Sequence, residues 1–587
     1  QNVAMIRNVF FHIQDTSLYE GNFQETLKNL GLGAYNQVSP QTLDTIRYAE
    51  IRDKKTDEIE LNRQATFLFN GELIVDPAVL ESQNYLEINN AYKEYYIDRT
   101  YKGLMELNLF QSVKPVLIEV PDSNLIDVHY YLVPSKKQSF SFDPKVTNSN
   151  GFLGTSLSTD YVNKNIFGGA QKLKLSLSFG LESQPPVFDP NEKDELIQLS
   201  SRSFNTFEIG PSLELDVPGL FPTKLTTLSK RHRPRTVFSF AMNYQRRSEF
   251  TRRTIQTNYL YKMFVSKTQI FQYGLPGLSV IKYVSIDKSD EFNQQIEQFN
   301  DAFLRNAYSD QLVWQDWKFN FEYNNKDRDN KVSKILLYYN GSFDPAGNIV
   351  GLFEDVQDVN DDGRHELFGV AYSRFVRLDN DLIVSRKVTK KTSFHAQVLA
   401  GAGITTGNEE TAMPFDYSFF AGGSNDNRGW HARSLGPGGY KYILDTNRTL
   451  TQIGDIRLAA SMEFRFPLSS TLKGAVFADA GNIWTLKEDV NRPGSQFTEN
   501  WMNEIAYSAG VGLRVDLDFF ILRFDLGFKL NNHTLPEGSR WFYQSRDAHE
   551  QELINTFGAD ELDRLRLENK IPDPFGFQFH FGIGYPF

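Results

Sequence analysis

Long runs of strict two-residue alternation are the feature that most limits how this chain can fold. In FILRFDLGFKL, residues 520–530, every even position is apolar, and the odd positions between them carry Arg523, Asp525 and Gly527. The same alternation occurs in residues 172–182, 504–517 and 575–587. Such runs are longer than the strands of most soluble sheets. They are long enough for a tilted strand to cross a membrane.

No segment contains the roughly 18–20 consecutive apolar residues that a transmembrane helix needs. Aromatic residues make up 14% of the chain and charged residues 23%, which is compatible with alternation of the two kinds. Apolar and polar residues alternate along the strands of two fold classes, the membrane β-barrel and the soluble β-sandwich.

Charge placement and loop lengths favour the membrane barrel. Arg514 and Asp516 lie on one face of the same predicted strand, as expected for a polar lumen. Short turns are predicted near 388–391 and 468–472. Long polar loops are predicted near 183–200, 288–312, 345–366, 406–452, 485–503 and 531–574. Short turns at one end and long loops at the other are typical of outer-membrane barrels.

Net charge and cysteine content exclude several function classes. A formal net charge of −11 argues against nucleic acid as a partner, because phosphate binding needs a basic surface. The cysteine count of 0 excludes disulfides, zinc–thiolate sites, a cysteine nucleophile and a cysteine-linked lipid anchor in this sequence. No signal peptide is recognisable after Gln1, so an exported protein would be shown here in a processed or truncated form.

Residues 1–137 have a different pattern, which predicts a small α+β region. Apolar spacing predicts a helix over 98–110, and composition suggests further short helices over 23–32 and 38–47. Strands are predicted over 66–74, 113–121 and 126–134. This region is expected at the short-turn, periplasmic end of the barrel, because the last strand finishes where the first one starts.

Several segments resemble the superfamily of outer-membrane insertases and translocators that includes BamA and TamA. NRGW, residues 427–430, is similar to the [VI]RG[FY] motif of the sixth extracellular loop, with Asn427 in place of the aliphatic residue and Trp430 in place of Phe or Tyr. FADAG, residues 477–481, resembles the FxDxG motif. Residues 99–142 resemble the end of a last POTRA domain that leads into a first barrel strand.

The resemblance implies a mainly β fold, with a sixteen-stranded transmembrane antiparallel β-barrel over 138–587 and loop 406–452 folded into the lumen. POTRA-type periplasmic domains would precede it in residues 1–137, the last of them at about 64–137. The TamA/TamL branch, the translocation and assembly module, is the most similar. The implied function is insertion or export of client polypeptides in the outer membrane of a Gram-negative bacterium, without enzymatic chemistry or a cofactor. Outer-membrane lipids, client β-strands and periplasm-spanning or accessory subunits would be its partners.

The motif residues predict a contact inside the barrel. Alternation over 456–466 turns Glu463 toward the lumen, and Asp479 lies between Phe477 and Gly481 on the inner face of the next strand. The guanidinium of Arg428 can bond both carboxylates, as the matched residues of the family do. Gly429 and Gly481 would allow close approach of loop and wall. The alternative is a solvated Arg428 and a lone lumenal Asp479.

The C-terminal strand resembles the family's terminal β-signal, which forms a lateral seam with the first strand, here predicted at 139–147. Its signal residues are Phe577, Phe579, Phe581, Gly582, Gly584, Tyr585 and Phe587. Unpaired backbone groups at a short seam can template an incoming strand. Gly582, Gly584 and Pro586 would weaken the seam, or they are simply the small residues of a curved barrel strand.

Other functions are weaker alternatives. DVNDDG places Asp358, Asn360 and Asp362 as the start of a calcium loop, but Gly369 stands where an EF-hand has Glu, so a solvated acidic loop is the favoured interpretation. A passive channel or uptake barrel remains open. A barrel lipase would need an outward His and Ser at matched heights, whereas alternation points His580 into the lumen.

Overall fold

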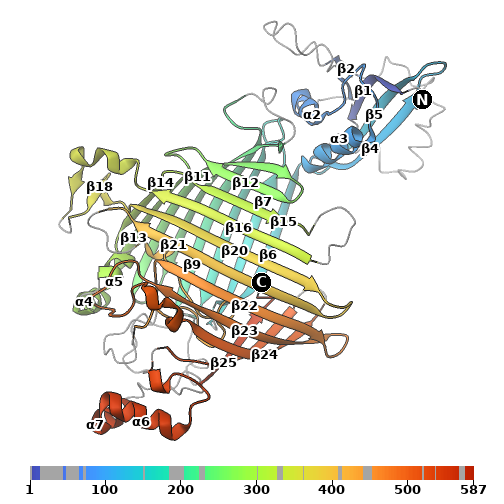
Figure 1. Ribbon diagram of the computed structural model, residues 1–587. Coiled ribbons are helices and arrows are strands. Elements are labelled where there is room, and N and C mark those ends of the chain that lie inside the picture. The colour runs from blue at the N-terminus through green and yellow to red at the C-terminus, as the bar shows by residue number, and fades with distance from the viewer. Residues whose placement is uncertain are drawn as a thin grey trace.

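The computed structural model of the protein combines a large closed β-barrel with a smaller domain at one end of it (Figure 1). It describes residues 3–13, 44–47, 65–69, 74–149, 152–183, 204–223, 232–299, 302–326, 335–360, 363–407, 413–440, 452–517, 521–533, 535, 537–567 and 576–586. We call the barrel end that meets the N-terminal domain the near end, and the opposite end the far end.

The barrel wall is built from long antiparallel strands that follow one another around the circumference in chain order. Its segments are β6 (Gln138–Ser149), β7 (Phe152–Asn163), β8 (Lys172–Glu182), β9 (Thr206–Pro218), β10 (Arg235–Arg246), β11 (Phe250–Ser266), β12 (Gln269–Gly274), β13 (Val280–Lys288), β14 (Gln311–Gln315), β15 (Phe319–Asn324), β16 (Ile335–Ala346), β20 (Phe375–Lys387), β21 (Ser393–Thr405), β22 (Ile456–Pro467), β23 (Leu472–Trp484), β24 (Ala506–Asp516), β25 (Ile521–Lys529) and β26 (Phe577–Ile583). The last segment, β26, lies beside β6 and closes the ring.

Two positions in the wall are interrupted. β12 and β13 both pair with the 17-residue strand β11, one with each half of it. On their other side they pair with β15 and β14. Between β12 and β13 the chain turns through Gly277, whose carbonyl accepts a hydrogen bond of 2.7 Å from the indole of Trp314.

Side-chain burial follows the predicted alternation. In β22, Met462 and Phe464 are exposed on the outside, while Glu463 and Arg465 are buried on the inside. An apolar outer face and a charged inner face are what a lipid-facing barrel requires. The mainly β, antiparallel barrel predicted from the sequence is therefore confirmed.

The N-terminal domain is a five-stranded sheet with helices. Its elements are β1 (Met5–Ile13), β2 (Asp44–Arg47), β3 (Ala65–Phe69), α2 (Pro77–Gln83), α3 (Glu94–Glu106), β4 (Phe110–Glu119) and β5 (Leu125–Pro134), with strand order β2-β3-β1-β5-β4. Helix α2 begins at Pro77, and the side chain of Asp76 caps it by accepting a hydrogen bond from the Ala78 amide at 2.8 Å. The core packs Phe11, Phe67 and Tyr130 against Leu80 and Leu104.

This domain departs from the sequence prediction in two respects. Residues 44–47, predicted to end a helix, form the edge strand β2, because sheet pairing with β3 overrides the local helical pattern. β1 pairs in parallel with β5, so the sheet takes residues from both sides of the domain boundary predicted near 64. The helix predicted over 23–32 lies outside the described residues.

The connections at the far end carry most of the remaining structure (Figure 1). They contain α4 (Asp290–Phe299), α5 (Ala302–Ala307), α6 (Arg546–Phe557), α7 (Ala559–Leu567), the 3₁₀ helices η7 (Val350–Val356), η8 (Phe415–Tyr417), η10 (Glu499–Glu504) and η11 (Glu537–Ser539), and a small sheet of β17 (Asp358–Val359), β18 (His365–Leu367) and β19 (Val370–Ala371). In the described residues, no helix is long and apolar enough to span a membrane. The far-end connection 247–249, between β10 and β11, is short, in contrast to the long loops predicted for that end.

The near-end turn between β7 and β8 docks into the N-terminal domain. Ala170 of this turn is buried in the domain's apolar core. The side chain of Asn165 donates to the carbonyl of Ile74 at 2.7 Å, and the carbonyl of Gly168 accepts from the Asp76 amide at 2.9 Å. The domain is thus attached to the wall beside the first strand.

Candidate functional site

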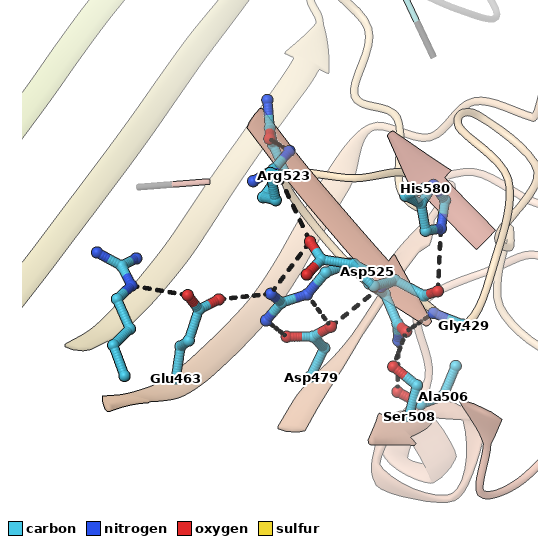
Figure 2. A network of polar contacts seen from close by, with 12 residues as sticks. Gly429, Glu463, Asp479, Ala506, Ser508, Arg523, Asp525 and His580 are labelled. Carbon is cyan, nitrogen blue, oxygen red and sulfur yellow. Dashed lines mark hydrogen bonds and ion pairs between the residues drawn. The ribbon is translucent and has the colours of Figure 1, made fainter. Parts of the chain in front are cut away.

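The long connection between β21 and β22 turns inward, and its tip is sealed against the inner wall (Figure 2). We call its residues 406–455 the inserted loop. Arg428 at its tip has only 1% of its surface exposed. The sequence predicted this loop and its arginine, and the structure places the arginine against the wall formed by β22, β23 and β25.

Arg428 binds Asp479 and Glu463, the two carboxylates that alternation turned toward the lumen. Its Nε and Nη2 donate to the two oxygens of Asp479 at 2.9 and 2.8 Å, and its backbone amide donates to Asp479 at 3.0 Å. Its Nη1 donates to Glu463 at 2.6 Å. The guanidinium therefore satisfies one carboxylate with paired donors and reaches a second.

Further charges surround this contact. Glu463 also accepts hydrogen bonds from Arg465 at 2.7 Å and Arg514 at 3.1 Å, and Arg514 binds Asp525. Charges buried this deeply persist only when they are paired. Among the described residues, the ion pairs of this network join four arginines, Arg428, Arg465, Arg514 and Arg523, with three carboxylates, Glu463, Asp479 and Asp525.

Phe477 forms the floor of the site. Its buried ring lies 3.5 Å from the Arg428 guanidinium carbon, which is a close cation–π contact. Phe477 is paired across the strands with Glu463, so the ring lies next to the carboxylate that the same arginine binds. The aromatic residue of the FADAG motif thus holds the plane of the guanidinium.

A glycine in the wall makes room for the loop tip. A Cβ on Gly527 of β25 would lie 2.1 Å from the Arg428 carbonyl oxygen. Gly481, expected to clear space for the loop, instead lies close to the neighbouring strand β22, where a Cβ would lie 2.8 Å from the Leu458 carbonyl oxygen. On the loop side, a Cβ on Gly429 would lie 2.7 Å from Ser508. Gly527 was not predicted as a site residue, although its position on the inner face of β25 follows from the alternation.

Asn427, where the family motif has an aliphatic residue, is a second attachment point. Its amide donates to the carbonyl of Ala506 at 2.9 Å and accepts from the Ser508 hydroxyl at 2.7 Å. Both partners belong to β24, so the residue that precedes Arg428 is also hydrogen-bonded to the wall. The departure from the motif thus replaces apolar packing with hydrogen bonds.

Trp430 packs under the loop. It is 1% exposed and belongs to an apolar cluster with Phe375, Phe419 and Ile483. The ammonium of Lys529 lies 5.4 Å from its ring centroid. Trp430 therefore fills the lumen behind the arginine.

The start of the inserted loop is held by the wall strands β11 and β13. The carboxylate of Asp416 accepts from Arg252 at 2.6 Å and from Lys282 at 2.5 Å. Burial of Asp416 opposes ionisation, but the two cations nevertheless lower its pKa below the ordinary value. Ion pairs thus hold the inserted loop to the wall at Asp416 and at Arg428.

A hydrogen bond joins the loop tip to the last strand. His580 of β26 lies 3.0 Å from the Arg428 carbonyl, to which its Nε2 donates (Figure 2). His580 faces the lumen, as alternation predicted, which places it away from the outer surface that a barrel lipase would use.

The first and last strands of the barrel are unlike the others. Every residue from Gln138 to Lys145 of β6 is exposed, including Phe140 at 71%. β26 is 7 residues long, against 12 for β6. Phe577, Phe579 and Ile583 are exposed on the outer face of β26, and Gly582 lies inside against Arg523.

Tyr585 does not continue the outward series that the alternation predicted. Strand β26 ends at Ile583, and Gly584 follows with φ +85°. This left-handed residue turns the chain, so the Tyr585 ring lies 4.0 Å from the guanidinium of Arg465 and its hydroxyl accepts from Lys473. Phe587 lies outside the described residues.

Of the three residues of the calcium candidate, Asn360 has a structural role in a turn. The side chain of Asn360 accepts a hydrogen bond from the Arg364 amide at 2.8 Å, which stabilises the turn between β17 and β18. Asp358 lies in β17, and Asp362 lies outside the described residues. In the described part of the chain, no group of three or more acidic or histidine side chains is placed to hold a metal.

Comparison with known proteins places this architecture in a family. A family model described as the Omp85 superfamily domain matches residues 147–587. The chain belongs to the Omp85 superfamily. This Omp85 protein has the fold of outer-membrane assembly and translocation proteins, and the predicted resemblance to the superfamily is confirmed.

Solved structures are also similar to this chain. BamA from Haemophilus ducreyi lacking POTRA domains 1–3 is 14% identical, with a TM-score of 0.53, over 87% of this chain and 89% of that chain. CdiB from Acinetobacter baumannii is 12% identical, with a TM-score of 0.44, over 90% and 86% of the two chains. No curated protein matches the sequence.

Several network members were not predicted as site residues. By alternation Arg465, Arg514, Arg523 and Asp525 fall on the inner faces of their strands, but none of them was predicted to take part in the contact. One signal in the sequence could have found them: charges repeat at inner positions of neighbouring strands, which an apolar sandwich core would not allow. Their connection to Arg428 through shared carboxylates depends on strand stagger, which the sequence does not specify.

Proposed function

We propose that this Omp85 protein inserts or exports client polypeptides through its N-terminal domain and the lateral seam between β6 and β26. The observation that carries this proposal is the exposure of β6 on both faces. β16, which pairs with strands on both sides, is mostly half-buried or buried. A strand edge without full pairing can accept an incoming strand by β-augmentation.

The proposal includes the finer architecture of the family. If β12–β13 and β14–β15 each count as one interrupted strand, the barrel has sixteen. The order β1, α2, α3, β4, β5 is the β-α-α-β-β order of a POTRA unit, here with an insertion that adds β2 and β3. The N-terminal domain and the near end would then lie in the periplasm of a Gram-negative bacterium.

The partners follow from this arrangement. The apolar outer face would contact outer-membrane lipids, and the seam would contact client strands. Accessory or periplasm-spanning subunits would bind the N-terminal domain, and no enzymatic step is required. The TamA/TamL branch remains the preferred placement within the superfamily. The inserted loop occupies part of the lumen, which argues against a passive channel.

The experiment is a comparison of surface and outer-membrane proteins in strains that carry the wild-type chain, Arg428→Ala, or no copy. We expect a set of client proteins to be depleted in the strain without the protein and partly depleted with Arg428→Ala. A matched control is Arg386→Ala at the near end of β20, outside the network. Unchanged client levels in the strain without the protein would contradict the proposal.

A further inference from the structure

A cavity of about 560 Å³ lies between the N-terminal domain and the near end of the barrel. One side is the C-terminal part of α3, with Gly103 and Glu106, and the other is formed by the first residues of β8 and β10 and the last residues of β9. We call this cavity the vestibule.

The barrel side of the vestibule belongs to the lumen. In β9, Leu213 is 40% exposed on the outer face, so Asp216, three residues later, points inward. Asp216 is paired across the strands with Lys172 and accepts from Arg235 at 2.6 Å. The vestibule therefore opens toward the inner wall and not toward lipid.

The vestibule is basic although the whole chain has a net charge of −11. Its two carboxylates are already paired, Glu106 with Arg233 and Asp216 with Arg235. Its lining adds three lysines beyond these pairs, Lys102, Lys164 and Lys172. Lys102 pairs with the half-exposed Asp98 outside the lining, and Lys164 donates to the Ser135 hydroxyl at 3.2 Å.

Such an excess of positive charge in a partly enclosed site concentrates anions. The lining also includes Met105 and Phe264, which offer apolar surface for a polypeptide backbone and side chains. A ligand that fits both features is an extended peptide with carboxylate side chains.

We propose that the vestibule is an entry site that binds acidic segments of an unfolded client polypeptide through Lys164 and Lys172. This rests on the proposed function and specifies the client chemistry for it. Binding at the junction would place a client next to the near end of β7 and β8, close to the first strand.

The test uses the full chain in detergent and a short fluorescent Glu-Gly-Ser peptide, with a Gln-Gly-Ser peptide of equal length for comparison. We expect the acidic peptide to bind more tightly, and the difference to shrink at high salt. Lys164→Glu with Lys172→Glu should weaken acidic-peptide binding about tenfold or more, because attraction becomes repulsion at two positions.

The matched control is Lys390→Glu with Lys391→Glu, which makes the same charge change in the exposed near-end turn between β20 and β21. Its binding should equal that of the wild type. A neutral pair, Lys164→Gln with Lys172→Gln, with a wild-type thermal transition, covers the case in which the reversed pair does not fold; its binding should be intermediate.

Three results would overturn the proposal: equal affinity for the two peptides, equal binding by the vestibule and control variants, or displacement of the peptide by inorganic phosphate where equal acetate has no effect. The last result would assign the vestibule to a phosphate group, such as a lipid headgroup. Because peptide binding is measured without client insertion, each failure leaves the seam proposal to be judged separately.

Discussion

The Nε2 of His580 lies 3.0 Å from the carbonyl oxygen of Arg428, so the last strand of the barrel is hydrogen-bonded to the tip of the inserted loop. This contact makes the seam strand and the loop depend on one another. Movement of β26 away from β6 would break the bond or carry the loop tip with it.

We expect His580→Ala to loosen the seam. Loss of the donor leaves a buried carbonyl without this hydrogen bond, at a cost of about 1–3 kcal/mol. Hydrogen exchange of the β26 amides should become faster, and His580→Gln, which retains an amide donor, should restore part of the protection. His395→Ala in β21 is the control, and equal loss of protection in β26 with that variant would contradict the coupling.

Arg428 and Asp479 should be strongly coupled in stability. Arg428→Ala leaves Asp479 without the two hydrogen bonds it receives from the guanidinium, while the backbone amide still donates to it. The cost should be about 3–5 kcal/mol, because a buried charge is left unpaired. The double variant with Asp479→Ala should therefore be less destabilised than the sum of the single variants, as measured by thermal unfolding in detergent. Additive effects would show that the pair does not hold the loop.

Gly527→Ala should displace the loop tip without changing any charge. The added methyl group would lie 2.1 Å from the Arg428 carbonyl oxygen, which leaves no space for it. Proteolysis of the inserted loop should become faster. Gly180→Ala in β8 is the matched control, because its methyl group would lie 3.6 Å from Glu208. A loop equally resistant in both variants would contradict the close fit.

The N-terminal domain should lose stability in mild acid. His12 and His129 lie 2.9 Å apart, and burial, followed by the charge of His129, lowers the pKa of His12 from 6.5 to about 3. Burial also lowers the pKa of His129. Below pH 6.5 the unfolded chain gains protons that the folded domain excludes, so stability is complete above that pH and falls as the pH decreases toward 3.

One pH unit below the ordinary pKa of His12, protonation of this residue in the unfolded chain lowers the folding stability by about 1.4 kcal/mol. Hydrogen exchange of the β1 and β5 amides, corrected for its intrinsic pH dependence, should show this loss. His12→Gln should reduce the pH dependence. If the wild-type domain is equally stable at pH 5.5 and 7.5, the histidines are not held neutral by folding.

Much of this architecture could be predicted from local pattern alone. Alternation identified the inner face of β22 and β23, and with it the positions of Glu463 and Asp479. What the pattern lacks is the spatial relation between distant segments. The insertion of Met5–Ile13 between β3 and β5, and the hydrogen bond from His580 to the loop, depend on tertiary pairing. The inward turn of Tyr585 depends on one left-handed glycine, Gly584, which breaks the alternation.

In the proposed mechanism, the exposed edge of β6 receives client strands. A disulfide scan tests it directly, because the chain contains no cysteine of its own. Single cysteines at Ser139 and Ser141 would be combined with cysteines in the C-terminal strand of a client, with Ser342→Cys in β16 as the control. We expect covalent adducts at β6 and none at β16. Adducts at neither strand, or equally at both, would contradict this mechanism.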